Sequence, residues 1–135
     1  MAIVSWNEAA VLNTIRQAVM RGVVGGTEKV RNEALRLIMQ TAKTGRLYRT
    51  RGVVHRASAP GESPASDTGR LANSITTAYD ATKLSGMVSA NTVYAPYLEY
   101  GTMKMEPRPF MRPALANTQQ QFVESVEKAV EAALR

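Results

Sequence analysis

The spacing of apolar residues along this chain changes twice, and this change constrains the fold more than any other feature. Between residues 6 and 43 the apolar side chains recur at helical intervals. Between residues 71 and 93 they alternate, as in a strand with one buried face, and from Pro113 onward the helical interval returns. The pattern predicts an α+β fold, in which a small antiparallel sheet of about three or four strands packs against a long N-terminal helix and a C-terminal helix.

Two adjacent glycines, Gly25 and Gly26, lie near the middle of the predicted N-terminal helix. Each glycine costs about 1 kcal/mol in a helix interior relative to alanine. We therefore expect the helix to be kinked or broken at this point, with Thr27 capping a second segment. Gly45 is expected just after its end.

The middle of the chain predicts a hairpin followed by a short helical turn. The alternation from Leu71 to Tyr79 predicts a strand, and residues 87–93 predict the returning strand after a turn. Residues 94–102 predict a helical turn that ends at Gly101.

A long polar segment, residues 44–69, separates the N-terminal helix from this hairpin. It contains few large apolar side chains and is rich in glycine, proline and serine. We expect an extended, flexible loop within a single domain of residues 1–135. Val53 and Val54 favour strand, so part of the loop is expected to form an extended arm.

Positive charge is concentrated in the first half of the chain. The formal net charge of +6 arises within residues 1–70, which hold 11 Lys/Arg and 5 Asp/Glu, whereas residues 71–135 hold 6 of each. The charge is densest between residues 43 and 56, where no acid occurs. Such a run contacts phosphates or an acidic protein, or it is simply a solvated loop. The candidate residues for such a contact, with DNA or with a partner protein, are Arg46, Arg49, Arg51 and Arg56.

The composition gives little support to catalysis. The chain has no cysteine, so disulfides and thiolate metal sites are excluded, and His55 is the only histidine, so no multi-histidine metal site can form within one chain. Neither of the two glycine motifs that bind phosphate groups, Gly-x-x-x-x-Gly-Lys-Ser/Thr and Gly-x-Gly-x-x-Gly, occurs in the sequence. Glu99 and Glu106 are expected to be surface acids. We expect neither a signal peptide nor a membrane span.

Tyrosines and prolines gather in residues 94–113. Tyr94, Tyr97 and Tyr100 recur every three residues, and each buried hydroxyl would need a partner, so some are expected to face a groove or another subunit. Three prolines stiffen the segment around Phe110, which either staples the last helix to the sheet or docks on a neighbouring subunit. The candidate subunit-interface residues are Tyr94, Tyr97, Tyr100, Arg108, Phe110 and Arg112.

Four short sequence blocks follow one another in the central part of the chain. They are HRASAPGESP at 55–64, DTGRLANSI at 67–75, YAPYLEYGT at 94–102 and RPFMRPAL at 108–115. In this order the blocks resemble the tail-component family of long-tailed bacteriophages, whose genes lie between the head genes and the tail genes. The sequence departs from the family pattern at Ser63 and Ser66, where bulkier or charged residues are common, and at the glycine pair in the first helix.

The resemblance implies a small structural protein of the virion neck or tail, assembled in the host bacterial cytoplasm, with no catalytic residue, metal or cofactor. We expect a ring of roughly six or twelve copies in the head–tail connector, neck or tail-completion apparatus. Its expected partners are neighbouring connector and tail-tube proteins, with a non-specific contact to genomic DNA in the channel. Two alternatives stay open: a tail terminator ring that caps the tail tube, and a DNA-binding accessory protein.

Overall fold

The computed structural model describes residues 5–66 and 69–135, and within them the predicted α+β fold is confirmed. Met1 to Val4 and the Asp67-Thr68 pair of the second sequence block lie outside the described residues, and expectations that involve them stay predictions. The elements in chain order are α1 (Glu8–Met39), β1 (Leu47–Thr50), β2 (Val53–Arg56), α2 (Arg70–Asn73), β3 (Ile75–Asp80), β4 (Ser85–Ala90), α3 (Ala95–Tyr100) and α4 (Met111–Ala133).

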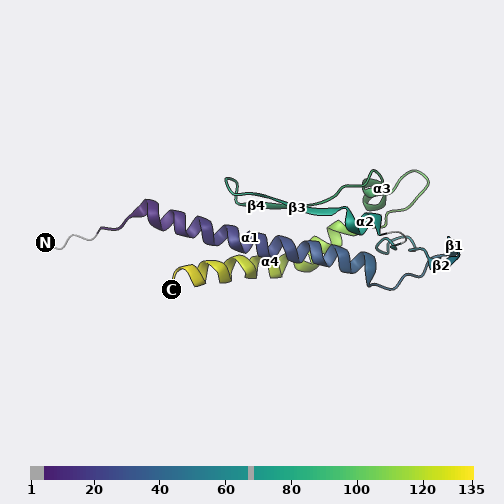
Figure 1. The fold of residues 1–135 in the computed structure, drawn as a ribbon, viewed down its shortest axis with the longest axis horizontal. Coiled ribbons are helices and arrows are strands. Elements are labelled where there is room, and N and C mark those ends of the chain that lie inside the picture. The colour runs from purple at the N-terminus through teal and green to yellow at the C-terminus, as the bar shows by residue number, and fades with distance from the viewer. Residues whose placement is uncertain (1–4, 67–68) are drawn as a thin grey trace.

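The molecule is elongated along its two long helices. Figure 1 shows α1 and α4 side by side and running in opposite directions, with the β3–β4 hairpin lying along α1. The β1–β2 hairpin projects at the end of the molecule where α1 ends. The chain thus has a two-helix body, a hairpin that covers one side of it, and a second hairpin beyond its end.

α1 is one continuous helix from Glu8 to Met39, so the expected break at Gly25-Gly26 is wrong. The reason is that Gly26, together with Gly22 one turn earlier, faces α4 at close range. A Cβ atom on Gly22 would lie 2.5 Å from the Cα atom of Val126, and one on Gly26 would overlap the ring of Phe122. The close helix contact offsets the low helix propensity of glycine.

The ends of α1 are set by local chemistry. The side chain of Asn7 caps its start by accepting the backbone N–H of Ala10 at 3.0 Å. The helix ends at Met39, earlier than the expected end near Gly45. Gly45 instead lies against the backbone of Ala57, to which its N–H donates at 2.9 Å. It therefore serves a close chain approach and not a helix terminus.

The β3–β4 hairpin confirms the predicted alternation, although β3 begins at Ile75 and Leu71 lies in α2. Alternate residues of β3 face α1, where the carboxylate of Glu28 accepts a hydrogen bond from Thr77 at 3.2 Å and one from the hydroxyl of Tyr79 at 2.7 Å. These bonds attach the hairpin to the middle of α1.

Thr27 was expected to cap a second helical segment, and this expectation is also wrong. It is buried inside α1, where its hydroxyl donates to the carbonyl of Val23 at 2.7 Å. Its side chain fills the space beside Gly86 of β4, where a Cβ atom would collide with it. Thr27 thus packs directly against the backbone of β4 at Gly86.

The strands form two separate two-stranded antiparallel sheets, not the single sheet of about three or four strands that was expected. β1 pairs only with β2 and β3 only with β4. The β3–β4 hairpin is held on α1, whereas β1–β2 lies beyond the end of that helix, so their edges do not meet (Figure 1).

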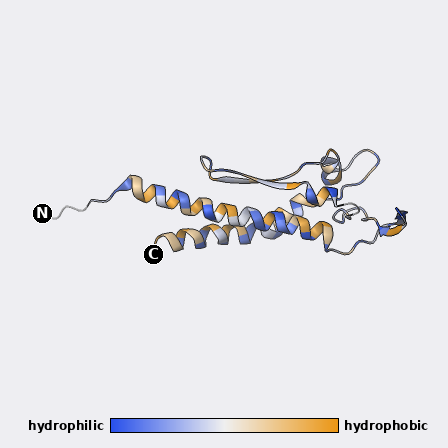
Figure 2. Ribbon diagram, in the orientation of Figure 1, coloured by the Kyte–Doolittle hydropathy of each residue, from blue (hydrophilic) through white to orange (hydrophobic). Residues whose placement is uncertain are grey.

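The hydrophobic core is concentrated where the second half of α1 meets α2, β3, α3 and the start of α4. Figure 2 shows hydrophobic positions interspersed with hydrophilic ones along both long helices, so that each helix buries only part of its surface. The core residues are Val30, Ala34, Leu37, Ile38, Leu71, Ile75, Ala95, Phe110 and Ala114.

Candidate interaction surfaces

The N-terminus of α4 is capped by Glu99 of α3. Helix α4 has no side-chain cap of its own. Instead, one carboxylate oxygen of Glu99 accepts the backbone N–H groups of Phe110 at 2.9 Å and Met111 at 3.0 Å, and the other accepts that of Arg112 at 2.9 Å. The free N–H groups and the helix dipole both favour an anion there. Glu99 is 7% exposed, so the expectation that it is a surface acid is wrong.

Phe110 lies in the core of its own chain. It is 1% exposed and is among the largest fully buried side chains. Of the two alternatives for this residue, the burial supports the staple that holds α4 to the rest of the fold. Docking on a neighbour would require the core to open, so we no longer include Phe110 among the interface candidates.

Arg108 connects three of the four sequence blocks within the chain. Its backbone N–H donates to the carbonyl of Leu98 at 2.6 Å, and its side-chain Nε donates to the carbonyl of Ser58 at 3.2 Å. Next to it, the carbonyl of Pro107 accepts the N–H of Gly61 at 3.0 Å. These contacts assign Arg108 a role in holding the loop, the helical turn and the proline segment together.

The remaining candidates of the segment 94–113 lie on the outside. Tyr94, Tyr97 and Tyr100 are 37%, 53% and 64% exposed. The guanidinium of Arg112 lies 4.5 Å from the centre of the Tyr100 ring, a cation–π contact that orders both exposed side chains. We call these four residues the tyrosine surface. It rests on a helical turn that Glu99 and Arg108 fix in place.

The β1–β2 hairpin forms a narrow ribbon that carries the basic run. Two backbone hydrogen bonds of 2.9 Å, from Gly45 to Ala57 and from Ala57 to Arg46, extend its ladder beyond the strands. We call residues 45–57 the basic ribbon. It projects away from the helices (Figure 1), and its exposed arginines are Arg46, Arg49, Arg51 and Arg56.

The strand register gives the ribbon two different faces. Leu47 pairs with Arg56 and Arg49 with Val54, so one face alternates apolar and basic side chains. On the other face the rings of Tyr48 and His55 stack with their centres 5.5 Å apart.

The tip of the ribbon is a two-residue turn with an unusual first residue. Arg51 and Gly52 both have positive φ, 53° and 79°, as in a type I′ turn. Glycine adopts this conformation freely, whereas a residue with a Cβ atom pays about 1 kcal/mol. Asparagine is the residue that such turns prefer in first place. The turn therefore does not explain why arginine stands at this position.

Glu62 closes the base of the ribbon. Its carboxylate accepts the backbone N–H of Ala59 at 2.8 Å, the backbone N–H of Thr44 at 3.0 Å and the hydroxyl of Thr44. The hydroxyl bond, followed by the two backbone bonds, lowers the pKa of Glu62 from 4.5 to about 2. The carboxylate thus stays ionised at neutral pH and holds together the segments just before and just after the ribbon.

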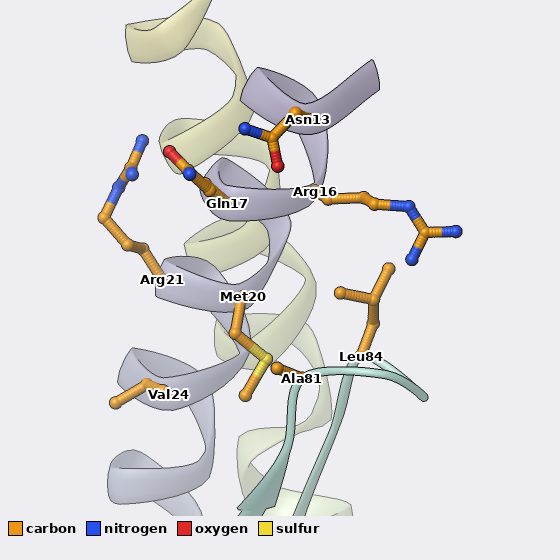
Figure 3. Close-up of a pocket in the computed structure, with 8 residues that line it drawn as sticks. All are labelled: Asn13, Arg16, Gln17, Met20, Arg21, Val24, Ala81 and Leu84. Carbon is orange, nitrogen blue, oxygen red and sulfur yellow. The ribbon is translucent and has the colours of Figure 1, made fainter. Parts of the chain in front are cut away.

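A groove of about 610 Å³ opens where the turn of the β3–β4 hairpin lies over the first half of α1. Figure 3 shows the end of the Met20 side chain beside Ala81, Leu84 pointing toward Arg16, and Arg21 extending away on the other side of the helix. Among the described residues that line the groove none carries a carboxylate, imidazole or hydroxyl. A second, apolar groove of about 460 Å³ lies between α1, β4 and α4.

Within residues 5–66 and 69–135, no group of three or more His, Asp or Glu side chains is placed so as to hold a metal ion. In the same described part of the chain, neither long helix is apolar enough over a sufficient length to cross a bilayer. No protein-family model, no curated protein and no solved structure matches this chain.

Proposed function

We propose that this protein is a structural subunit of a ring in the head–tail connector, neck or tail-completion apparatus of a long-tailed bacteriophage. The observation that carries the proposal is the tyrosine surface. Exposed tyrosines and an arginine stand on a rigid support, and these residue types are enriched where a few side chains supply most of an interface's binding energy.

The convergence of the sequence blocks supports the same proposal. Blocks that are far apart in the chain meet through Arg108 and Glu99, and they place α3 firmly against the start of α4. A rigid surface loses little entropy when it docks. A closed ring needs a patch that meets a different patch on the next copy, and a rigid, aromatic surface suits one half of such a contact.

Assembly of the purified protein tests the ring. We expect light scattering coupled to size exclusion, together with negative-stain electron microscopy, to show closed rings. Tyr97→Ala removes an exposed anchor, so the association is expected to weaken by about 2 kcal/mol, roughly 30-fold in the dissociation constant. The melting temperature of the subunit is expected to stay the same, because Tyr97 is 53% exposed.

Trp6→Ala is the matched control, because it removes another large aromatic residue that is 67% exposed. Trp6 lies two residues before α1, and Figure 1 shows the start of α1 at the opposite end of the molecule from α3. Equal association of the Tyr97 variant and the control would exclude the tyrosine surface as the interface. Particles produced without this protein are expected to be filled heads and separate tails under the electron microscope. Joined, infectious particles in its absence would contradict the proposed function.

A further inference from the structure

We propose that the basic ribbon is a binding arm for duplex DNA, with Arg51 at its tip contacting the phosphate backbone without regard to sequence. This goes beyond the ring proposed above, because DNA binding by the ribbon requires neither a ring nor a virion. The inference rests on the shape of the ribbon, on its charge and on the conformation of Arg51.

The ribbon has the shape of a free-standing arm. It is made of two short strands that pair only with each other, and Leu47, Val53 and Val54 are each more than half exposed. An isolated two-stranded hairpin is marginally stable in water, so its retention as a projecting element needs a reason outside its own packing. The major groove of B-DNA is wide enough to admit a two-stranded ribbon.

The charge of the ribbon is suited to a polyanion. Four arginines lie within residues 46–56, and among the described residues no carboxylate forms an ion pair with Arg46, Arg49 or Arg51. The guanidinium group matches the geometry of phosphate oxygens and keeps its charge at all physiological pH values.

The arrangement of arginines and apolar side chains on the ribbon disfavours an acidic protein as the partner. The centre of a protein–protein interface is depleted of charged residues other than arginine and is more apolar than its rim. On one face of the ribbon each apolar side chain is paired with an arginine, since Leu47 lies opposite Arg56 and Val54 lies opposite Arg49. This face offers phosphate contacts along its whole length and has no contiguous apolar centre.

Arg51 points to binding because the turn itself disfavours it. It occupies a left-handed conformation at the outermost point of the ribbon, where asparagine would be the better turn residue. Residues that are kept in sparsely populated backbone conformations cluster at functional sites, so such a residue suggests that its side chain has a function. Here that chemistry is an exposed positive charge at the turn of the ribbon.

Salt-dependent binding to DNA tests the inference. Fluorescence anisotropy of short labelled duplexes of two unrelated sequences is measured with the full-length protein at increasing salt concentration. If the four arginines each contact a phosphate, the logarithm of the binding constant falls against the logarithm of salt concentration with a slope of about −3.6. Both sequences are expected to bind equally.

Arg51→Asn separates binding from folding, because asparagine favours the turn. We expect the variant to melt at or above the wild-type temperature, to bind several-fold more weakly and to lose about one unit of the salt slope. Adding Arg49→Gln to the Arg51→Asn variant is expected to reduce the salt slope by about one further unit. Lys83→Asn is the matched control: it removes one positive charge from the exposed turn of the other hairpin and is expected to leave the slope unchanged.

Several results would overturn the inference. Wild-type protein that does not bind duplex at low salt, or ribbon variants that bind as well as the control, would exclude the ribbon as a DNA arm. Poly-glutamate that competes as strongly as duplex would assign the ribbon to an acidic protein. Strong discrimination between the two sequences would indicate a sequence-specific accessory protein. Light scattering on the same samples shows whether rings form, so failure of DNA binding is distinguishable from failure of the proposed function.

Discussion

The carboxylate of Glu99 supplies, for α4, the cap that the helix does not carry itself. Three backbone N–H groups that would otherwise lack an acceptor converge on it. The residue before the helix is Phe110, which cannot accept a hydrogen bond through its side chain and is needed in the core. One carboxylate therefore allows an aromatic residue to stand at the N-cap position of α4, and it joins α3 to α4.

We expect Glu99→Gln to destabilise the protein by about 1.5–3 kcal/mol, the range for hydrogen bonds to a charged group. Glutamine keeps the length of the side chain but has only one acceptor oxygen, so at least one N–H loses its partner. Equilibrium unfolding in urea measures the loss. Glu106→Gln, on an exposed side chain in the same segment, is the control. Equal stability of the two variants would show that the cap contributes nothing.

At the scale of elements, the contact between α1 and α4 depends on which glycine faces the partner helix. Gly22 and Gly26 are buried against Val126 and Phe122, whereas Gly25 has no atom near its missing Cβ. Glycine is therefore tolerated at positions 22 and 26 because it allows the two helices to pack closely. At Gly25 only its low helix propensity acts.

Alanine substitutions at Gly25 and Gly22 are expected to change the free energy of unfolding in opposite directions. Gly25→Ala adds a methyl group in open space and is expected to stabilise the protein by up to about 1 kcal/mol. Gly22→Ala would place a Cβ atom 2.5 Å from a backbone atom that cannot rotate away, so it is expected to destabilise by about 1–3 kcal/mol. Thermal melting of both variants measures the two effects. A change of melting temperature in the same direction for both would contradict the packing role of Gly22.

The molecule as a whole is held together at one end of its long axis. The core cluster takes residues from α1, α2, β3, α3 and α4, and Phe110 is its largest member. Both candidate interaction surfaces lie at this end, and the first turns of α1 extend away from it (Figure 1). Unfolding of this cluster is therefore expected to release these five elements in one cooperative step.

Phe110→Ala is expected to cost about 3–5 kcal/mol of folding stability, because it leaves a cavity in a fully buried site. Leu115→Ala lies on the same helix but is 58% exposed, so it is expected to cost far less. Circular dichroism of the isolated variants measures both. A Phe110 variant that melts normally yet fails to assemble would restore this residue to the subunit interface.

The sequence alone determined the features that depend on neighbouring residues. The two helical stripes, the alternation in β3, the helical turn that exits at Gly101 and the extended conformation around Val53 and Val54 are all present in the structure. Each depends on interactions within a few positions along the chain, which a pattern of residue types records. The exposure of the tyrosines also followed from their own chemistry.

Only the tertiary structure decided the features that depend on residues far apart. Whether Gly26 breaks a helix or packs against another depends on Phe122, and the role of Glu99 depends on a helix that starts beyond a proline-rich turn. The one local sign was that no Ser, Thr, Asp or Asn stands just before α4, which left its cap to be supplied from elsewhere. Packing between distant segments leaves no period in the sequence, because either partner alone is compatible with several environments.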